Sequence, residues 1–192
     1  MILLKKKILF NSFVISTIGE ITLVAHIMRF FLSSKRQKNK IYIMQNIFTQ
    51  KDNQEIIERI SKLTPNSQRL WGKMSASQML EHCQKPLEVA TGSLELKRTF
   101  IGFLFGKIAK KVFIGNKPLS KNMPTVKDFI IKSDSDFDTQ KTILVSRIVD
   151  FGIKGSSIIG IKTHPFFGEM TNDEWGILTF RHLDHHLIQF GV

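Results

Sequence analysis

The chain has 192 residues, of which 42% are apolar and 23% charged, enough for one ordinary domain with a sizeable core. Its single cysteine, Cys83, excludes an intramolecular disulfide, as is usual in a reducing compartment, so we expect a cytoplasmic protein. The formal charge of +12 is uneven: residues 1–43 hold 8 basic residues and 1 acidic residue, a net of +7, and the remainder holds 20 basic and 15 acidic residues, a net of +5. A mildly basic remainder without a basic–aromatic motif does not indicate a nucleic-acid partner.

Residues 1–43 form a leader that differs from the rest of the chain. Lysines precede apolar runs within residues 8–32, which Glu20 interrupts. A carboxylate near the middle of a membrane helix would cost roughly 2.5–3.5 kcal/mol on insertion scales, and no clean small-x-small cleavage site follows. Three interpretations stay open: a mis-set start, since Met44 opens a sequence that runs straight into the domain, a membrane anchor through residues 8–32, and a cleaved signal. We therefore separate the leader from one domain, residues 44–192, and expect membrane contact only if the leader is an anchor.

Two helices are expected at the start of the domain. The first begins at the capping-box pair Asp52 and Glu55 and ends before the turn sequence Thr64-Pro-Asn. The second begins at Ser75, where Gln78 completes a capping box. Both helices carry apolar residues at helical spacing, which predicts that one face of each is buried.

His82 lies on the second helix, beside its apolar stripe. Pro86 comes four residues later, so the carbonyl of His82 loses its helical partner and a kink is expected. Taken alone, His82 is most simply explained as a histidine at the edge of the core that bonds a backbone carbonyl. Cys83 is expected to be a small buried apolar residue, because no base is placed beside it.

Residues 99–113 predict an amphipathic helix with a wide apolar face and a lysine flank. It is typical either of a membrane-surface helix or of a bundle helix with a solvated basic side, and we favour the bundle helix. Its apolar outer face also suggests a homodimer. Residues 115–127 are expected to be a loop, and a helix follows from the acidic stretch at Asp134 to Gly152. The long connection after it, ending in His164-Pro-Phe-Phe-Gly, is expected to contain no strand.

The last stretch, TNDEWGILTFRHLDHHLIQFGV, predicts a final helix that starts at the capping box of Thr171 and Glu174. His182 and His186 are four residues apart and so lie on one face, whereas Asp184 points elsewhere. A lone pair of histidines at this spacing is weak evidence for a metal and needs a third ligand.

Three segments together resemble the DinB/YfiT-like superfamily. They are LTPNSQRLWGKMSASQMLEHCQ, FIGFLFGKIAKK and KTHPFFGEMTNDEWGILTFRHLDHHLIQFGV. The resemblance covers roughly residues 50–192 and leaves out the leader. The resemblance implies an all-α fold, a DinB-like four-helix bundle (up-down-down-up) with a long crossover loop. It also implies a divalent metal, zinc or nickel first and iron next, held by His82, His182 and His186. Asp184, His185 and Gln189 are candidates for hydrogen-bonded support of these ligands, and His164 is a candidate for the mouth of the site.

The function implied is that of a divalent-metal-dependent enzyme acting on a small-molecule substrate. Three neutral imidazoles leave a metal its full charge and an open position, where a water or a thiol would ionise near neutral pH. The resemblance suggests a transferase that uses a low-molecular-weight thiol, and a metal-hydroxide hydrolase is the neighbouring hypothesis. The alternative is a helical bundle that binds a metal or small ligand without catalysis, since no carboxylate base stands at motif spacing. The catalytic residues beyond the metal ligands stay unknown.

Overall fold

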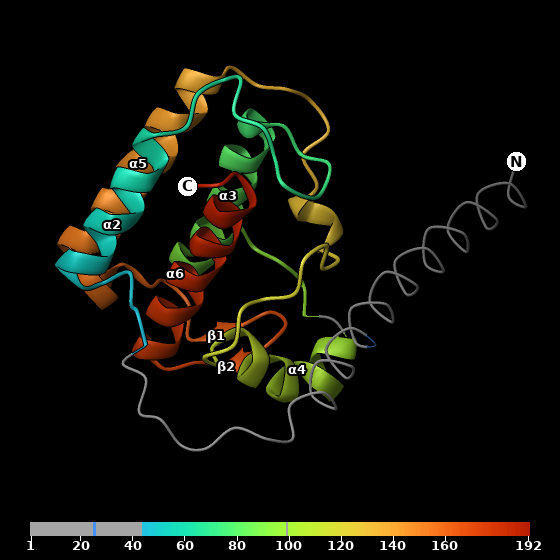
Figure 1. Cartoon of the computed structure of the whole chain (residues 1–192). Helices are drawn as coiled ribbons and strands as arrows, with labels where there is room; N and C mark the ends of the chain where they lie inside the picture. The colour runs from blue at the N-terminus through green and yellow to red at the C-terminus, as the bar shows by residue number, and fades with distance from the viewer. Residues whose placement is uncertain (1–24, 26–43, 99) are drawn as a thin grey trace, which may run out of the picture.

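The computed structural model describes residue 25 and residues 44–98 and 100–192 (Figure 1). The leader interpretations for residues 1–43 therefore lie outside the described residues, apart from Ala25. Five α-helices carry most of the described chain: α2 (Gln50–Ser61), α3 (Ala76–Thr91), α4 (Phe100–Phe113), α5 (Phe137–Lys154) and α6 (Asn172–Gln189). The remaining elements are two 3-10 turns, η1 (Lys127–Phe129) and η2 (Gly155–Ile158), and two short strands, β1 (Thr163–His164) and β2 (Gly168–Glu169). The predicted all-α class is confirmed as a mostly helical fold.

Local capping determines where α3 and α6 begin. The Ser75 hydroxyl accepts from the backbone N–H of Gln78, and the Gln78 side chain accepts from the N–H of Ser75. Thr171 and Glu174 make the same reciprocal pair at α6. Both predicted starts are confirmed, because a capping box needs only residues within one turn.

The predicted start of α2 is wrong by one turn. The cap is Thr49, whose hydroxyl accepts from the N–H of Asp52. Asp52 does not cap the helix, because its carboxylate instead accepts from the N–H of Asn46, at 2.8 Å, in the chain that leads into α2. An acidic side chain at this position also interacts favourably with the helix dipole.

Four helices pack in pairs around the core, α3 against α5 and α6, and α2 against α5 and α6 (Figure 1). A buried amide joins two of them, because Asn53 of α2 donates to the carbonyl of Ile148 on α5 at 2.8 Å. Gly152 of α5 lies so close to Asn53 that an added Cβ would come within 2.8 Å of it. The consequence for the site is that α3 and α6 lie against each other, with His82 on one and His182 and His186 on the other.

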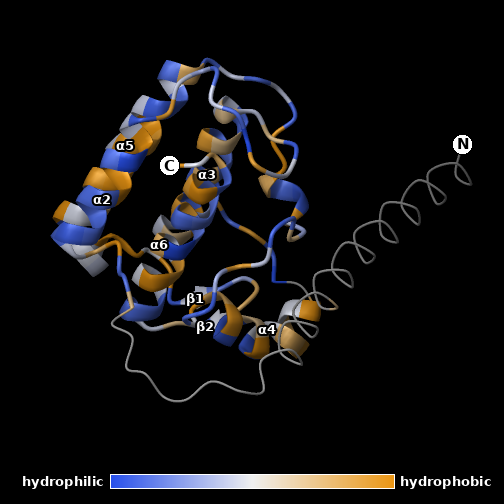
Figure 2. Cartoon of the chain, in the orientation of Figure 1, coloured by the Kyte–Doolittle hydropathy of each residue, from blue (hydrophilic) through white to orange (hydrophobic). Residues whose placement is uncertain are grey.

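The prediction that residues 99–113 form a bundle helix is wrong. Helix α4 packs on β2, and the side that it buries consists of small residues with one valine: Gly102, Gly106, Ala109 and Val112. The close approach explains the glycines, since a Cβ at Gly106 would lie 2.0 Å from the carbonyl oxygen of Phe166. Four large apolar side chains expected in the core are exposed instead: Phe100, Phe103, Leu104 and Ile108. Figure 2 shows the hydrophobic and hydrophilic residues that alternate along α4.

The connection after α5 contains structure that the sequence pattern did not predict. β1 and β2 form an antiparallel hairpin in which Thr163 pairs with Glu169 and His164 with Gly168. Gly168 has a φ of +80°, a conformation that glycine adopts without strain. Across residues 44–98 and 100–192, none of the helices combines the length and the apolar character needed to cross a bilayer.

Candidate metal centre

Helix α3 brings His82 into the interior. Its imidazole is 4% exposed, and its Nδ1 lies 2.9 Å from the backbone carbonyl of Phe129 in η1. A carbonyl can only accept, so Nδ1 carries the proton and donates. The lone pair of His82 is therefore on Nε2, the ring atom that faces α6.

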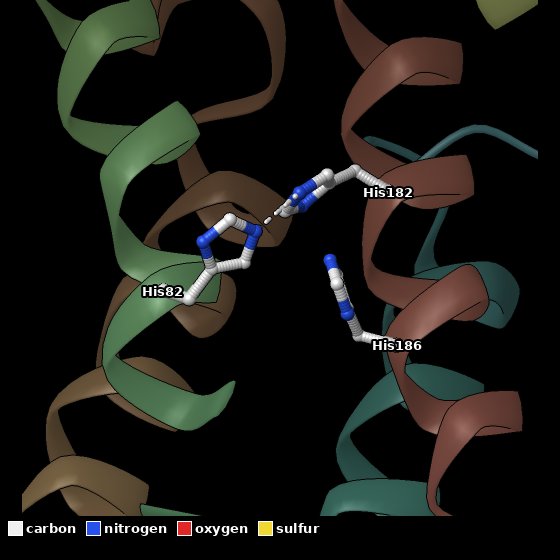
Figure 3. A group of neighbouring side chains, drawn as sticks. All are labelled: His82, His182 and His186. Atoms are coloured by element: carbon white, nitrogen blue, oxygen red, sulfur yellow. Dashed lines mark hydrogen bonds between the residues drawn. The ribbon is translucent and has the colours of Figure 1, made fainter. Parts of the chain in front are cut away.

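Helix α6 supplies two more imidazoles from one face. His182 and His186 lie one turn apart, with ring centroids separated by 4.7 Å, and each ring lies against His82 (Figure 3). One nitrogen from each of His82, His182 and His186 lies within 4.8 Å of the other two. The i, i+4 spacing provides two of these nitrogens, and the packing of α3 on α6 provides the third.

Gln189 determines which nitrogen of His186 is free. Its amide nitrogen donates to the carbonyl of Trp71 at 2.7 Å, so its amide oxygen faces His186 Nδ1 at 2.8 Å. An oxygen acceptor there requires that Nδ1 carry the proton, which leaves the lone pair of His186 on Nε2. Both His82 and His186 are thus held with Nε2 unprotonated, the form in which imidazole binds a metal.

The surroundings keep the three imidazoles neutral. Burial lowers the pKa of His82, although its bond to the Phe129 carbonyl acts in the opposite direction. Burial lowers the pKa of His186 to about 3, with the neighbouring His82 adding to the effect. The pKa of His182 falls well below its ordinary value, first through burial and then through repulsion from a charged His186 or His82. A metal would therefore not compete with protons for these ligands near neutral pH.

The separation of two of the three imidazole nitrogens fits a tetrahedral ion. His182 Nε2 lies 3.3 Å from His82 Nε2. Two imidazole nitrogens bound at about 2.0–2.1 Å to a tetrahedral zinc would be separated by about 3.3 Å. Because His82 Nε2 is unprotonated, the proton between these two nitrogens belongs to His182 Nε2. Binding of a metal by His182 Nε2 requires the other tautomer, in which His182 carries its proton on Nδ1.

A cavity of about 460 Å³ opens beside the imidazoles. Its walls are mainly apolar: Trp71, Met74, Phe113, Leu119, Met123, Pro124, Phe129, Ile130 and Ile131. Lys73 is the one cation on the described lining, which includes no carboxylate. A metal held by these three imidazoles would have room for a further ligand on the side of the cavity.

The three residues expected to support the metal ligands, Gln189, His185 and Asp184, differ in where their side chains lie. Gln189 orients His186 as described, and His185 lines the cavity with its ring 5.8 Å from that of Trp71 and 5.2 Å from that of His186. Asp184 makes no such contact, because its carboxylate accepts from Arg59 of α2 at 2.7 Å. A step of two residues from His182 turns it toward another helix.

His164 lies away from the cavity wall. Its Nδ1 accepts from the N–H groups of Phe166 and Phe167, at 3.0 and 3.2 Å, and its ring packs on Phe167 and Trp175. It therefore organises the hairpin before α6, and it is not among the residues that line the cavity. Cys83 is buried, and burial raises the pKa of its thiol, so the thiol stays protonated.

Residues 44–191 match the model of a family described as a protein of unknown function, DUF1569. The chain belongs to this family. The expected membership of the DinB/YfiT-like superfamily is wrong, because the match is to a separate family. A histidine pair on a last helix with a third histidine on an earlier one follows from ligand chemistry, so it does not distinguish helical families. Neither the curated proteins nor the solved structures contain a match to this chain.

Proposed function

We propose that the protein is a divalent-metal-dependent enzyme that acts on a small molecule with an apolar part. The observation that carries the proposal is the set of His82, His182 and His186, which converge beside a cavity. Two of the Nε2 lone pairs are oriented by hydrogen bonds that the Nδ1–H of the same ring donates. Imidazole ligands suit zinc, nickel, iron and copper, and we place zinc and nickel first and iron next. A bound metal would lower the pKa of a water or thiol ligand and polarise a substrate carbonyl.

The chain's own residues would bind and orient the substrate. The apolar walls exclude water and contact an apolar substrate group, which strengthens electrostatic interactions inside the cavity. Lys73 supplies a positive charge, and Gln78, Asn122 and Thr125 supply hydrogen-bonding groups. The carbonyl of Phe129 and the amide of Gln189 hold the imidazoles in position while substrate binds.

Hydrolysis is the reaction class that we place first. Transfer to a low-molecular-weight thiol rested on the resemblance that the family match overturns, and now rests only on the ability of a metal to ionise a thiol. The absence of a carboxylate from the described cavity lining favours a second candidate, a protein that binds a metal or small ligand without catalysis. Turnover separates the two candidates, because a binding protein releases its ligand unchanged.

We also infer that α2, α3, α5 and α6 form a four-helix bundle. Their pairwise packing supports this arrangement. The up-down-down-up order and the long crossover loop stay predictions.

Metal content of the full chain, measured by mass spectrometry, tests the proposal. We expect about one metal ion per chain in the parent and in His164→Asn, and loss of the metal in His182→Ala/His186→Ala. His164→Asn is the matched control, since it replaces a packed histidine outside the cluster. Equal and low content in all three proteins would overturn the metal site.

Activity is measured next, with ester and amide substrates carrying apolar groups. We expect turnover by the metal-loaded parent that a chelator abolishes and that returns when the metal is restored. Stoichiometric metal without turnover of any substrate would leave the binding protein as the function.

A further inference from the structure

Helix α4 exposes a set of large apolar side chains on one side. Phe100 is 74% exposed, Phe103 65%, Leu104 51% and Ile108 37%. The helix buries its small residues against the hairpin, so these side chains have no place in the core. Four large apolar groups on one short helix form a patch of the kind that marks an interaction surface.

The segment around this patch is strongly basic. Residues 97–127 contain 8 basic residues and no acidic one: Lys97, Arg98, Lys107, Lys110, Lys111, Lys117, Lys121 and Lys127. Lys107 and Lys111 are exposed among the apolar side chains of α4, and the guanidinium of Arg98 lies 5.5 Å from the ring centroid of Phe103. A partner for this surface must therefore accept apolar side chains and carry negative charge at the same time.

One lysine anchors the helix instead. Lys110 donates to Glu174 at 2.8 Å and to the carbonyl of Glu169 at 2.9 Å. These contacts hold α4 on the hairpin and the start of α6, so the apolar patch is presented by a fixed helix.

Two other occupants fit less well. A second copy of the chain would bring Lys107 and Lys111 of one molecule close to those of the other, because they lie within the patch itself. Helix α4 is too short to span a bilayer. Its 14 residues form a helix about 21 Å long, whereas the hydrocarbon core is about 30 Å thick. A helix with an apolar face and a basic flank is instead of the kind that lies along a membrane surface.

We propose that α4 docks on an anionic phospholipid surface. Phe100, Phe103 and Leu104 enter the boundary between headgroups and acyl chains, while Lys107, Lys111 and Arg98 lie at the level of the lipid phosphates. The two contributions are separable, because salt screens the charges and leaves the apolar burial intact.

Vesicle sedimentation of the full chain tests the charge requirement. We expect binding to phosphatidylcholine vesicles that contain phosphatidylglycerol, weak binding to pure phosphatidylcholine, and a loss of affinity as salt rises. The variant Phe100→Ser/Phe103→Ser/Leu104→Ser should bind at least about tenfold more weakly. Ile153→Ser is the matched control, because it also removes an exposed apolar side chain: Ile153 is 77% exposed on α5. The positive charge of the neighbouring Lys154 is balanced by its ion pair with Asp150, so this position lacks the basic surroundings of α4. Equal binding to both vesicle types, or a triple variant that binds as tightly as the parent, overturns the proposal.

Depth-dependent quenching locates the contact even if another part of the chain also binds lipid. Brominated anionic lipids should quench the fluorescence that Phe103→Trp adds to the parent, and should not quench the fluorescence that Ile153→Trp adds. Equal quenching of the two added tryptophans, or none at position 103, contradicts docking through α4. Sedimentation velocity without vesicles tests whether a second copy covers the patch. A parent that is dimeric and a triple serine variant that is monomeric would overturn the proposal in favour of a second copy.

Discussion

At the scale of single residues, the site depends on backbone atoms as much as on histidines. The carbonyl of Phe129 holds His82, and the carbonyl of Trp71 orients Gln189, which in turn holds His186. Neither carbonyl has a signature in the sequence, because every residue carries one. Only their placement by η1 and by the chain before α3 gives them a role.

The role of Gln189 leads to the first prediction. Gln189→Leu should lower metal affinity about 10–100-fold, because His186 loses the acceptor that keeps its proton on Nδ1. A titration with a competing chromophoric chelator measures this. Gln84→Leu is the matched control, since Gln84 is also 4% exposed but bonds to Gln140. A metal affinity that falls equally in both variants would assign the effect to general destabilisation.

At the scale of elements, local signals predict the starts of α3 and α6 correctly, but they place the start of α2 one turn too late. The capping boxes of Ser75 and Thr171 are confirmed, because all their partners lie within one turn. The amphipathic pattern of α4 correctly groups Phe100, Phe103 and Leu104 on one face. It does not say what covers that face, and the hairpin takes the glycine side because only that side permits backbone contact.

The packing of α4 gives the element-scale prediction. Gly106→Ala should destabilise the protein by about 1–3 kcal/mol, because the new Cβ meets the backbone carbonyl of Phe166, which cannot rotate away as a side chain can. This clash opposes the gain of about 1 kcal/mol that alanine offers in a helix. Urea denaturation measures the difference. Lys111→Ala on the exposed side is the control and should be nearly neutral, and a Gly106→Ala protein as stable as the parent would contradict the close contact.

At the scale of the whole molecule, folding buries histidines in neutral form. Burial lowers the pKa of His164 to about 3, and it also lowers the pKa values of His82, His182, His185 and His186. The unfolded chain binds protons at the ordinary histidine pKa of about 6.5, and the folded chain does not. Stability is therefore fully present above about pH 6.5 and falls as the pH drops toward the folded pKa values, because protonation then favours the unfolded chain.

His164 isolates this effect from the metal ligands. In the presence of a metal chelator, we expect the free energy of unfolding of the parent to decrease as the pH falls from 6.5 to 4. Each histidine whose pKa is lowered by burial contributes up to about 1.4 kcal/mol per pH unit. The free energy of unfolding of His164→Asn should decrease less steeply with falling pH, and the difference in slope should correspond to about one bound proton. The asparagine oxygen can still accept from the N–H groups of Phe166 and Phe167, but the amide does not titrate. Urea denaturation at several pH values measures the slopes. Identical slopes would show that His164 is not neutralised by folding.

Local residue patterns predict the helical class, the capped starts of α3 and α6, and the shared face of His182 and His186, because each depends on residues within a few turns of one another. Tertiary packing brings His82 onto this pair, gives Asp184 its partner Arg59, and places His164 where it organises a hairpin. These contacts join segments far apart in the chain or depend on the local backbone path. Tertiary packing also decides which side of α4 faces outward. An amphipathic pattern specifies only which residues lie together on one face. The buried side is the one whose glycines allow close approach to a neighbouring backbone.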